Sequence, residues 1–262
     1  MQTTEWLYGI HAINELINRR PADIQELLFQ QERQDKRIQE LQHKATSLGI
    51  PWQTVARKTL EKRLGINSTG PDADKAPVHQ GVAALCWQPD FARHEKELKP
   101  LLDSLDHAPL LLVLDAITDP HNLGACLRTA DAAGVDAVIV PKDNSAPLNM
   151  TVRKVASGAA ETVKLYTVTN LSRTLAQLKE RGIWVVGAAG EASQGLHSLD
   201  LTLPTAIVMG SEGKGMRRLT REHCDYLAAI PMAGALSSLN VSVATGVMLY
   251  EAVRQRQALK GL

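Results

Sequence analysis

From Pro109 onward the chain alternates short apolar runs with stretches of helical periodicity, and no other feature constrains the fold as much. The apolar runs have the length and composition of buried parallel strands. They are Leu110–Leu114, Ala137–Val140, Val163–Val168, Trp184–Val186, Ala206–Met209 and Leu227–Ile230. The helical stretches are Leu123–Ala133, Val152–Ala160, Leu171–Lys179, Arg217–Cys224 and a last one from about Ser238. This alternation predicts an α/β fold with a mostly parallel sheet, whose ligands bind beyond the carboxyl ends of the strands.

The residues before this region have the pattern of a second, smaller α/β unit. Its expected strands are Trp6–Tyr8, Ile24–Phe29, Trp52–Val55 and Gly81–Cys86, and its expected helices are His11–Asn18, Asp35–Leu48 and Thr59–Leu64. A polar stretch at 67–79 is typical of a surface loop, and the charged stretch 89–107, which contains Pro89 and Pro100, of a linker that is partly helical from Glu95 to Leu105. We therefore expect a domain at 1–88, a linker at 89–107 and a domain at 108–262.

Composition places this chain among ordinary globular proteins. Its 262 residues exceed the usual length of one domain, and 44% of them are hydrophobic and 22% charged. The net charge of +1 means that any binding to nucleic acid must be local. Basic residues do occur in pairs in the first domain, at Arg19-Arg20, Lys36-Arg37, Arg57-Lys58 and Lys62-Arg63. A solvated helix face explains these pairs as well as a phosphate-binding surface does.

The three cysteines, Cys86, Cys126 and Cys224, are far apart and odd in number. Their spacing argues against a disulfide framework or a zinc site and favours buried thiols in a reducing compartment. The N-terminus lacks the pattern of a signal peptide, and no apolar run approaches the roughly 18 residues of a membrane span. We expect a cytoplasmic protein with no membrane partner and no metal.

The first expected strand of the second domain ends in Asp115 and continues as AITDPHNLGACLRTA. Pro120 and Asn122 suit the start of a helix capped by Asp119. Arg128 then lies inside an apolar helical stretch, where it requires an anionic partner. That partner could be Asp115 or Asp119 in a structural ion pair, or a bound phosphate.

Two later strand ends also carry unusual residues. Val208–Met216 reads VMGSEGKGM, with three glycines in six residues, so the backbone must turn tightly or approach a ligand closely. It lacks the spacing of a P-loop or a dinucleotide fingerprint, and its SxxK has no KTG downstream, as a serine hydrolase of that type would have. A glycine-lined pocket for an adenosine-like ligand fits better.

The third strand end runs from Ile230 into a helix through IPMAGALSSLNVSVATG. Asn240 and Ser242 occupy an apolar helix start, where such side chains compete with the backbone for hydrogen bonds. One interpretation places the helix cap at Ser237 or Ser238 and turns the other polar side chains to water. The other holds Ser238 and Asn240 toward a substrate.

Together, DxxxDPxNxGxxxRTA, MGSEGKGM and IPMAGALSSLNVSVATG resemble the three motifs of the SPOUT superfamily, TrmH (SpoU) branch, in the family's order from Pro109 to about Leu259. Members of this family methylate ribose 2'-hydroxyls of RNA. The first domain resembles the small ribosomal-protein-like module of the subgroup that methylates a guanosine of 23S rRNA. The resemblance implies a C-terminal domain with a deep trefoil knot, a homodimer, and S-adenosylmethionine as the cofactor.

The resemblance also assigns residues to the site. It places Gly210, Ile230, Met232 and Leu239 at S-adenosylmethionine. It matches Arg128 to the family's catalytic arginine, and Asn122, Glu212, Ser238 and Asn240 to its other active-site positions, which displaces the simple ion pair at Arg128. Because a guanidinium is a poor base, we expect Arg128 to act as a fixed cation that binds the RNA phosphate and lowers the pKa of the hydroxyl.

The expected partner is 23S rRNA or a precursor of the large ribosomal subunit, bound in part by the paired basic residues of the first domain. A tRNA methyltransferase of the same family would more often carry short basic extensions than a separate small domain. A ribosome-assembly factor without catalysis would have no need of an intact Asn122, Arg128, Glu212 and Asn240. A nicotinamide-binding protein would need the glycine fingerprint that is missing.

Overall fold

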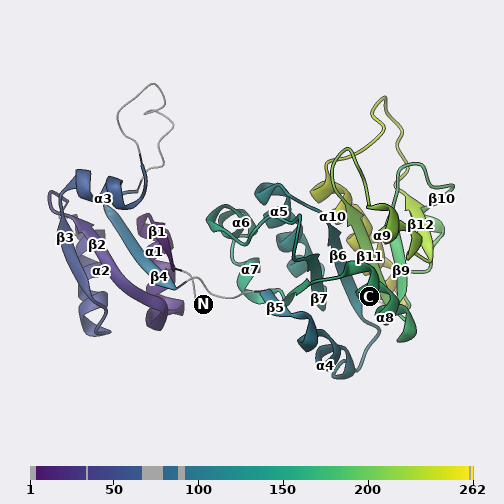
Figure 1. Ribbon diagram of the computed structural model, residues 1–262, viewed down its shortest axis with the longest axis horizontal. Coiled ribbons are helices and arrows are strands. Elements are labelled where there is room, and N and C mark those ends of the chain that lie inside the picture. The colour runs from purple at the N-terminus through teal and green to yellow at the C-terminus, as the bar shows by residue number, and fades with distance from the viewer. Residues whose placement is uncertain (1–3, 34, 67–78, 88–91, 260, 262) are drawn as a thin grey trace. The chain divides into compact units, whose positions relative to one another are not determined.

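The computed structural model describes residues 4–33, 35–66, 79–87, 92–259 and 261. The chain divides into two compact units, Met1–Asp90 and Phe91–Leu262. Figure 1 shows the first unit in purple to blue and the second in teal to yellow. Most of the loop expected at 67–79, and the first residues of the linker expected at 89–107, lie outside the described residues.

The first unit is a four-stranded sheet in the order β1-β4-β2-β3, counted over the described residues. Its strands are β1 (Thr4–Tyr8), β2 (Ile24–Gln30), β3 (Trp52–Val55) and β4 (Val82–Trp87), and its helices are α1 (Ile10–Arg19), η1 (Pro21–Asp23), α2 (Lys36–Ser47) and α3 (Arg57–Arg63). Strand β4 is antiparallel to β1 and β2, whereas β3 is parallel to β2. All four strands and the three α-helices overlap the segments expected from the sequence.

The second unit is built on an eight-stranded sheet in the order β10-β12-β9-β11-β6-β7-β8-β5, in which each pairing of the described strands is parallel. The strands are β5 (Ala92–His94), β6 (Leu110–Asp115), β7 (Ala137–Pro141), β8 (Leu165–Val168), β9 (Trp184–Ala188), β10 (Gln194–Gly195), β11 (Thr205–Gly210) and β12 (Tyr226–Ala229). The predicted α/β class and parallel sheet are confirmed.

Helices cover both faces of this sheet, because alternate side chains of each strand point to opposite faces. Along β6, Leu112 and Leu114 join one buried cluster and Leu111 and Val113 the other. The first cluster is completed by α5 (Pro120–Ala132), α6 (Met150–Ala156), α7 (Ala159–Thr162), η4 (Leu196–Ser198) and α10 (Val241–Leu259). The second is completed by α4 (Leu98–Asp103) and α8 (Leu171–Glu180); η3 (Glu95–Glu97) and α9 (Arg218–Glu222) are short neighbours.

Three details differ from the sequence-based expectation. Residues 92–103 of the expected linker belong to the second unit, where they form β5 and, in the stretch expected to be helical, η3 and α4. The helix expected over Val152–Ala160 is broken into α6 and α7 by Ser157, at φ 52°, and Gly158, at φ 94°. The last helix begins at Val241 rather than near Ser238.

The described helices include none that is both long and apolar enough to cross a membrane.

Candidate active site

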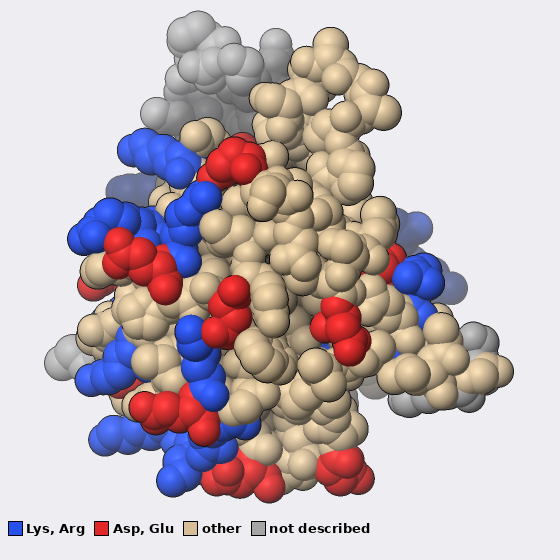
Figure 2. Space-filling model, turned by 90° about the vertical axis from the view of Figure 1, so that its right-hand side faces the viewer, with Lys and Arg blue, Asp and Glu red and all other residues tan. Residues whose placement is uncertain are grey.

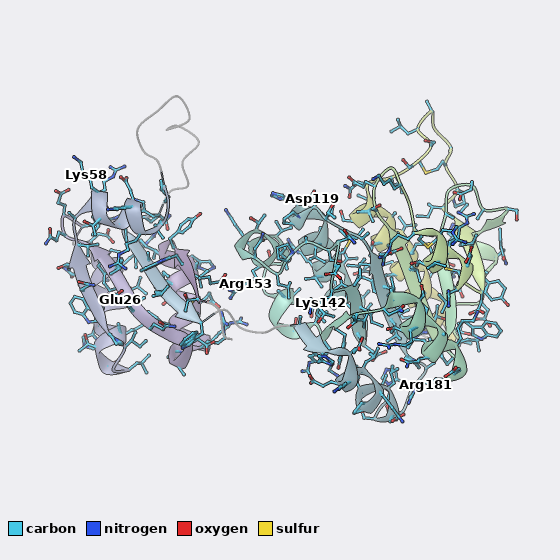
Figure 3. All side chains as sticks on the ribbon, in the orientation of Figure 1. Glu26, Lys58, Asp119, Lys142, Arg153 and Arg181 are labelled. Atoms are coloured by element: carbon cyan, nitrogen blue, oxygen red, sulfur yellow. The ribbon has the colours of Figure 1, made fainter. Side chains whose placement is uncertain are left out.

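The carboxyl ends of β6 and β11 meet at one edge of the sheet, since Gly210 pairs with Asp115 across the two strands. Helix α5 begins beyond β6, where Asp119 Oδ1 accepts a hydrogen bond of 2.9 Å from the backbone N–H of His121. Figure 3 labels Asp119 at this edge, from which the loop between β12 and α10 also projects in Figure 1. All three motifs of the sequence therefore reach one edge.

Three of the predicted catalytic residues meet in a single hydrogen-bonded cluster at this edge. The side-chain amide of Asn240 donates to Asn122 Oδ1 at 2.9 Å and also to Glu212 Oε1. Glu212 Oε1 further accepts from the backbone N–H of Val241 at 3.4 Å. Asn122 is buried at 8% exposure, although it is a polar residue on α5. The cluster therefore links α5, the glycine-rich loop and the start of α10, which lie 28 to 118 residues apart in sequence.

Asn240 is also the residue that caps α10. Its Oδ1 accepts from the N–H of Ser242 at 2.9 Å and from the Ser242 hydroxyl at 2.6 Å. These bonds fix the side chain, so that its amide nitrogen faces Asn122 and Glu212. The interpretation with a cap at Ser237 or Ser238 is therefore wrong. Asn240 both starts the helix and joins the polar cluster.

The glycine-rich loop after β11 folds tightly back on itself. Ser211 and Gly215 exchange backbone hydrogen bonds of 3.0 and 2.9 Å, and Gly213 and Gly215 have positive φ angles of 77° and 67°. A Cβ on Gly210 would lie 2.1 Å from backbone atoms of Gly215 and Met216. Glycine is thus required at position 210 by the close approach of backbone.

An ion pair between a buried carboxylate and a partly exposed arginine anchors the far end of this loop. Asp115, with no exposed surface, accepts from Arg217 Nε at 2.6 Å and from the Arg217 backbone N–H at 2.8 Å. The sequence allowed Asp115 as a partner of Arg128, but Asp115 pairs with Arg217 instead. The pairing with Arg217 was missed because the two residues are 102 positions apart and share no spacing pattern.

Arg128 is exposed on α5. Within the part of the chain that the structure describes, it forms no hydrogen bond or ion pair, and Asp115 and Asp119 are engaged elsewhere. The described contacts do not join Arg128 to the Asn122–Glu212–Asn240 cluster. Its guanidinium is free to bind an external anion.

The thiol of Cys126, on the same helix as Asn122, is unreactive. Cys126 lies buried on α5, with its Sγ 3.4 Å from the hydroxyl of Thr245 on α10. Burial raises the pKa of this thiol to about 11. A neutral, enclosed thiol is not a nucleophile, so Cys126 serves the packing of α5 against α10.

The segment 231–240 has the chemistry of a ligand-binding loop. All ten residues are exposed, and Met232, Leu236 and Leu239 expose 38%, 75% and 37% of their surface. In the described structure, no backbone group of residues 231–239 makes a hydrogen bond. Free N–H and C=O groups beside apolar side chains suit the edge and face of a nucleobase.

Of the remaining residues predicted at the cofactor and the substrate, Ile230 directly precedes this loop, Ser238 lies within it, and Gly210 ends a separate strand, β11. Ile230 is partly buried against the first hydrophobic cluster of the second unit. Ser238 is exposed and makes no hydrogen bond to the described residues. The structure thus brings the loop and the polar cluster to the same edge of the sheet. Among the described residues, no group of three or more His, Cys, Asp or Glu side chains could hold a metal ion.

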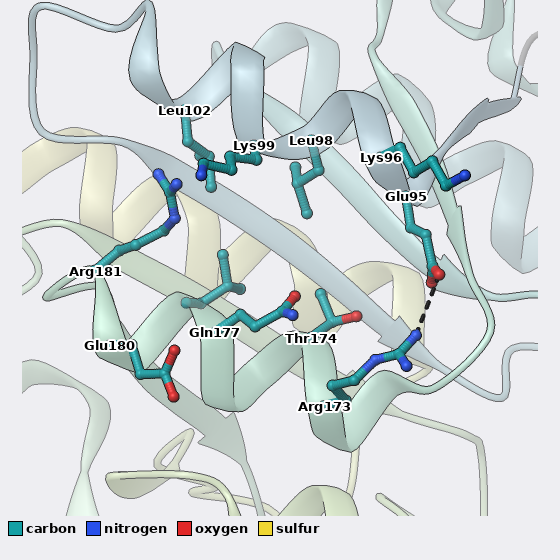
Figure 4. A pocket seen from close by; sticks show the side chains of 11 residues that line it. Glu95, Lys96, Leu98, Lys99, Leu102, Arg173, Thr174, Gln177, Glu180 and Arg181 are labelled. Carbon is teal, nitrogen blue, oxygen red and sulfur yellow. Dashed lines mark hydrogen bonds and ion pairs between the residues drawn. The ribbon is translucent and has the colours of Figure 1, made fainter.

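A cavity of about 530 Å³ lies elsewhere, between the η3–α4 segment and α8 (Figure 4). Arg173 crosses it to form an ion pair of 3.2 Å with Glu95, and Arg181 pairs with Asp103 at 2.7 Å. Its lining residues are Glu95, Lys96, Leu98, Lys99, Leu102, Arg173, Thr174, Gln177, Leu178, Glu180 and Arg181. It contains no residue of the candidate site.

The parallel sheet, with the polar cluster at its carboxyl edge, defines an α/β protein whose site is built from three loops. A family model identifies the class. Residues 109–250 match the SpoU rRNA Methylase family, to which this chain belongs. Residues 6–69 match a second model, described as RNA 2'-O ribose methyltransferase substrate binding.

Curated relatives match both units together. The chain is 54% identical over 260 residues to the 23S rRNA (guanosine-2'-O-)-methyltransferase RlmB of Pseudomonas aeruginosa, covering 99% of this chain and 100% of that protein. It is 56% identical over 254 residues to RlmB of Haemophilus influenzae, covering 97% and 98%.

Among solved structures, the SpoU methyltransferase AviRb of Streptomyces viridochromogenes, in complex with AdoMet, superposes with a TM-score of 0.75. The match covers 97% of this chain and 91% of AviRb at 24% sequence identity, which is a likeness of fold.

Proposed function

We propose that this protein transfers a methyl group from S-adenosylmethionine to the ribose 2'-hydroxyl of a guanosine in 23S rRNA. The observation that carries the proposal is similarity over the full length, in both units, to enzymes named for this reaction. The cluster of Asn122, Glu212 and Asn240, with Arg128 unpaired in the described structure, supports it. A protein that had lost catalysis would have no need of this arrangement.

The residues around the loop 231–240 suit S-adenosylmethionine. Gly210 lets the backbone of Gly215 and Met216 approach closely, which shapes the glycine-rich loop, and Met232, Leu239 and Ile230 offer apolar contact beside the free backbone groups of the loop 231–240. These residues would hold the adenosine part of S-adenosylmethionine at this edge of the sheet. S-adenosylmethionine, when bound, supplies an electrophilic methyl group on a positively charged sulfur. The trefoil knot implied for this part of the chain stays a prediction.

The protein must make a weak nucleophile reactive and align it. Arg128 binds the phosphate next to the target ribose, and its fixed charge lowers the pKa of the 2'-hydroxyl and stabilises the oxygen while the hydroxyl proton passes to water. Asn122, Glu212 and Asn240 restrain one another, so that the ribose meets a rigid polar surface. Ser238, which is exposed at the same edge, supplies a hydroxyl to orient the ribose.

The enzyme acts as a homodimer. Val243 and Tyr250 on α10 expose 53% and 51% of their surface, and the uncharged loop 231–240 exposes Leu236. In Figure 2, much of the face that includes β10 and β12 is uncharged, while Lys and Arg gather toward one side. Exposed apolar surface of this kind marks a protein interface. Sedimentation equilibrium should give a dimer mass, and Tyr250→Arg should shift it toward the monomer.

The reaction takes place in the cytoplasm, where ribosomal RNA is made and where free thiols such as the three cysteines persist. Its substrate is the 23S rRNA or a precursor of the large subunit.

The test is methyl transfer from labelled S-adenosylmethionine to unmodified 23S rRNA and, separately, to unmodified bulk tRNA. Label recovered as 2'-O-methylguanosine in rRNA, and lost in Arg128→Ala, is the expected result. Label in tRNA alone would overturn the substrate and keep the chemistry. Label in neither RNA, nor in ribosomal precursor particles, would overturn the enzymatic function.

A further inference from the structure

Both ends of the glycine-rich loop are held by one residue, Asp115. At the entry, Gly210 of β11 pairs with the backbone of Asp115 at the end of β6, and the two strands lie side by side (Figure 1). At the exit, the Asp115 carboxylate accepts hydrogen bonds from the backbone N–H of Arg217 at 2.8 Å and from its Nε at 2.6 Å. The entry and the exit of the loop are therefore fixed at the same point of the sheet.

Between these ends the loop has few contacts of its own. It closes on itself where Ser211 and Gly215 exchange backbone hydrogen bonds. Residues 212–215 are exposed, and within the described structure Glu212 alone links residues 212–214 to another element by hydrogen bonds, at the start of α10. The position of Glu212 therefore depends on how firmly the two ends of the loop are held.

Two adjacent side chains hold the exit. Met216 packs against the second hydrophobic cluster in space that exists because Gly187 has no Cβ, since a Cβ there would lie 2.7 Å from Met216 Cε. Arg217 follows with its two bonds to Asp115. Because one carboxylate binds both the backbone N–H and the side chain of Arg217, it fixes the position and the direction of the chain at that residue.

Stability alone does not account for this ion pair. Asp115 has no exposed side-chain surface, so its charge has lost its hydration, whereas the Arg217 side chain is 45% exposed. An apolar pair of similar size would stabilise such a position as well, because the cost of desolvation offsets the attraction between the charges. An apolar pair would not, however, fix the direction of the chain that leaves the loop.

We infer that Arg217 is a positioning residue of the proposed methyl transfer, because its bonds to Asp115 hold Glu212 within the polar cluster. The inference rests on the proposed function and adds two residues on which the reaction depends. Asp115 also begins the segment that leads to Asn122 on α5. The ion pair thus ties the loops after β6 and β11 together at their bases, and the polar cluster ties them together farther along.

The test is a double-mutant cycle in the full-length protein, made of Arg217→Ala, Glu212→Ala and the double variant. The kcat for methyl transfer is measured at saturating S-adenosylmethionine and RNA, and the affinity for 23S rRNA is measured separately. Arg218→Ala is the matched control, because Arg218 is the next residue and pairs with Glu222 on the surface at 2.7 Å. Hydrogen exchange of the Gly215 amide, without cofactor or RNA, reports on the loop itself.

We expect Arg217→Ala to lower kcat by about 10- to 100-fold, because the polar cluster is misplaced, with RNA affinity unchanged. In the Glu212→Ala background the same substitution should change kcat by less than about twofold, since the residue through which it acts is already absent. The Gly215 amide should exchange at least about tenfold faster in Arg217→Ala. Arg218→Ala should match the unaltered protein in each measurement.

Full kcat in folded Arg217→Ala, or losses that multiply in the double variant, would overturn the positioning role and leave the proposed function standing. Failure of the unaltered protein to methylate RNA would overturn the proposed function, and exchange of the Gly215 amide would still decide whether Arg217 holds the loop. If Arg217→Ala does not fold, because the Asp115 carboxylate has lost its partner, Arg217→Lys replaces it in the cycle. That variant keeps a cation but lacks the Nε donor, so the same pattern with a smaller loss of kcat is expected, and the same results would overturn it.

Discussion

Arg128 shows how a residue can look structural in sequence and yet be free in the fold. Its apolar neighbours suggested an internal ion pair, but Asp115 is committed to Arg217 and Asp119 to the start of α5. The side chain is exposed and unpaired among the described residues. A cation held in this way costs little stability and leaves its charge available to a substrate.

We predict that Arg128→Ala lowers kcat by about 10²-fold, the scale for removing one electrostatic contact to a developing oxyanion. Arg128→Lys should also lose most of the activity, because a point charge does not replace a planar fork at a phosphate. Single-turnover methyl transfer measures both. Both variants should unfold at the same urea concentration as the unaltered protein. Near-normal turnover of Arg128→Lys would contradict the role assigned to the fork.

Glycine is required at position 210 because neighbouring backbone approaches closely, not because of an unusual φ angle. We predict that Gly210→Ala displaces the loop 211–216, since a Cβ there would lie 2.1 Å from backbone atoms that cannot turn aside. Because Glu212 then loses its place beside Asn240, affinity for S-adenosylmethionine and methyl transfer should each fall by at least about tenfold.

Calorimetric titration with S-adenosylmethionine measures the loss of affinity in Gly210→Ala. Gly195→Ala is the matched control, because a Cβ there has no heavy atom within 4 Å. Equal affinity in the two variants would show that the loop tolerates the side chain.

At the scale of elements, one guanidinium anchors the last helix, α10, to the sheet. The anchor lies at the amino ends of the strands, opposite the candidate site. Arg256 donates to the carbonyl oxygens of Ala108, Pro109, Leu201 and Leu203 at 2.7 to 3.1 Å. Desolvation lowers the pKa of this guanidinium below its usual range. The carbonyls belong to the segments before β6 and β11, so Arg256 fixes the end of α10 whose beginning carries Asn240.

We predict that Arg256→Met destabilises the protein by about 2–4 kcal/mol, because several carbonyls lose a charged donor without water replacing it. The midpoint of urea unfolding should fall accordingly, while the KM for RNA of the folded enzyme stays unchanged. Arg218→Met is the control: that residue forms an exposed pair with Glu222, and its loss should cost less than about 1 kcal/mol. A similar loss in both variants would show that the carbonyls find other partners.

The sequence predicted the long elements well and the short ones poorly, for a physical reason. Buried parallel strands such as β6 are continuous apolar runs, which periodicity detects at once. Strands β5 and β10 have three and two residues and lie at the edges of the sheet, so no run forms. The motifs located Asn122, Glu212 and Asn240, but the hydrogen bonds among them, and the pair of Asp115 with Arg217, depend on contacts between segments more than 25 residues apart.

At the scale of the whole molecule, the chain has two units with separate hydrophobic cores and different features. The second unit contains the sheet, both of its covering layers and the entire candidate site. The first has its own sheet and helices, and its helix α3 carries four exposed cations, Arg57, Lys58, Lys62 and Arg63. A net charge of +1 therefore does not oppose RNA binding, since affinity depends on where the cations lie.

We predict that deleting residues 1–90 leaves a folded protein that binds S-adenosylmethionine with unchanged affinity, because residues 91–262 retain both buried clusters and the site. Its affinity for 23S rRNA should fall by at least about tenfold, and salt should weaken its binding less steeply, since each lost phosphate contact reduces the salt dependence by about one power of concentration. Filter binding over a range of salt concentrations measures both quantities, and circular dichroism controls for folding. RNA affinity equal to that of the full chain, in a fragment that still binds S-adenosylmethionine, would place substrate recognition in the second unit alone.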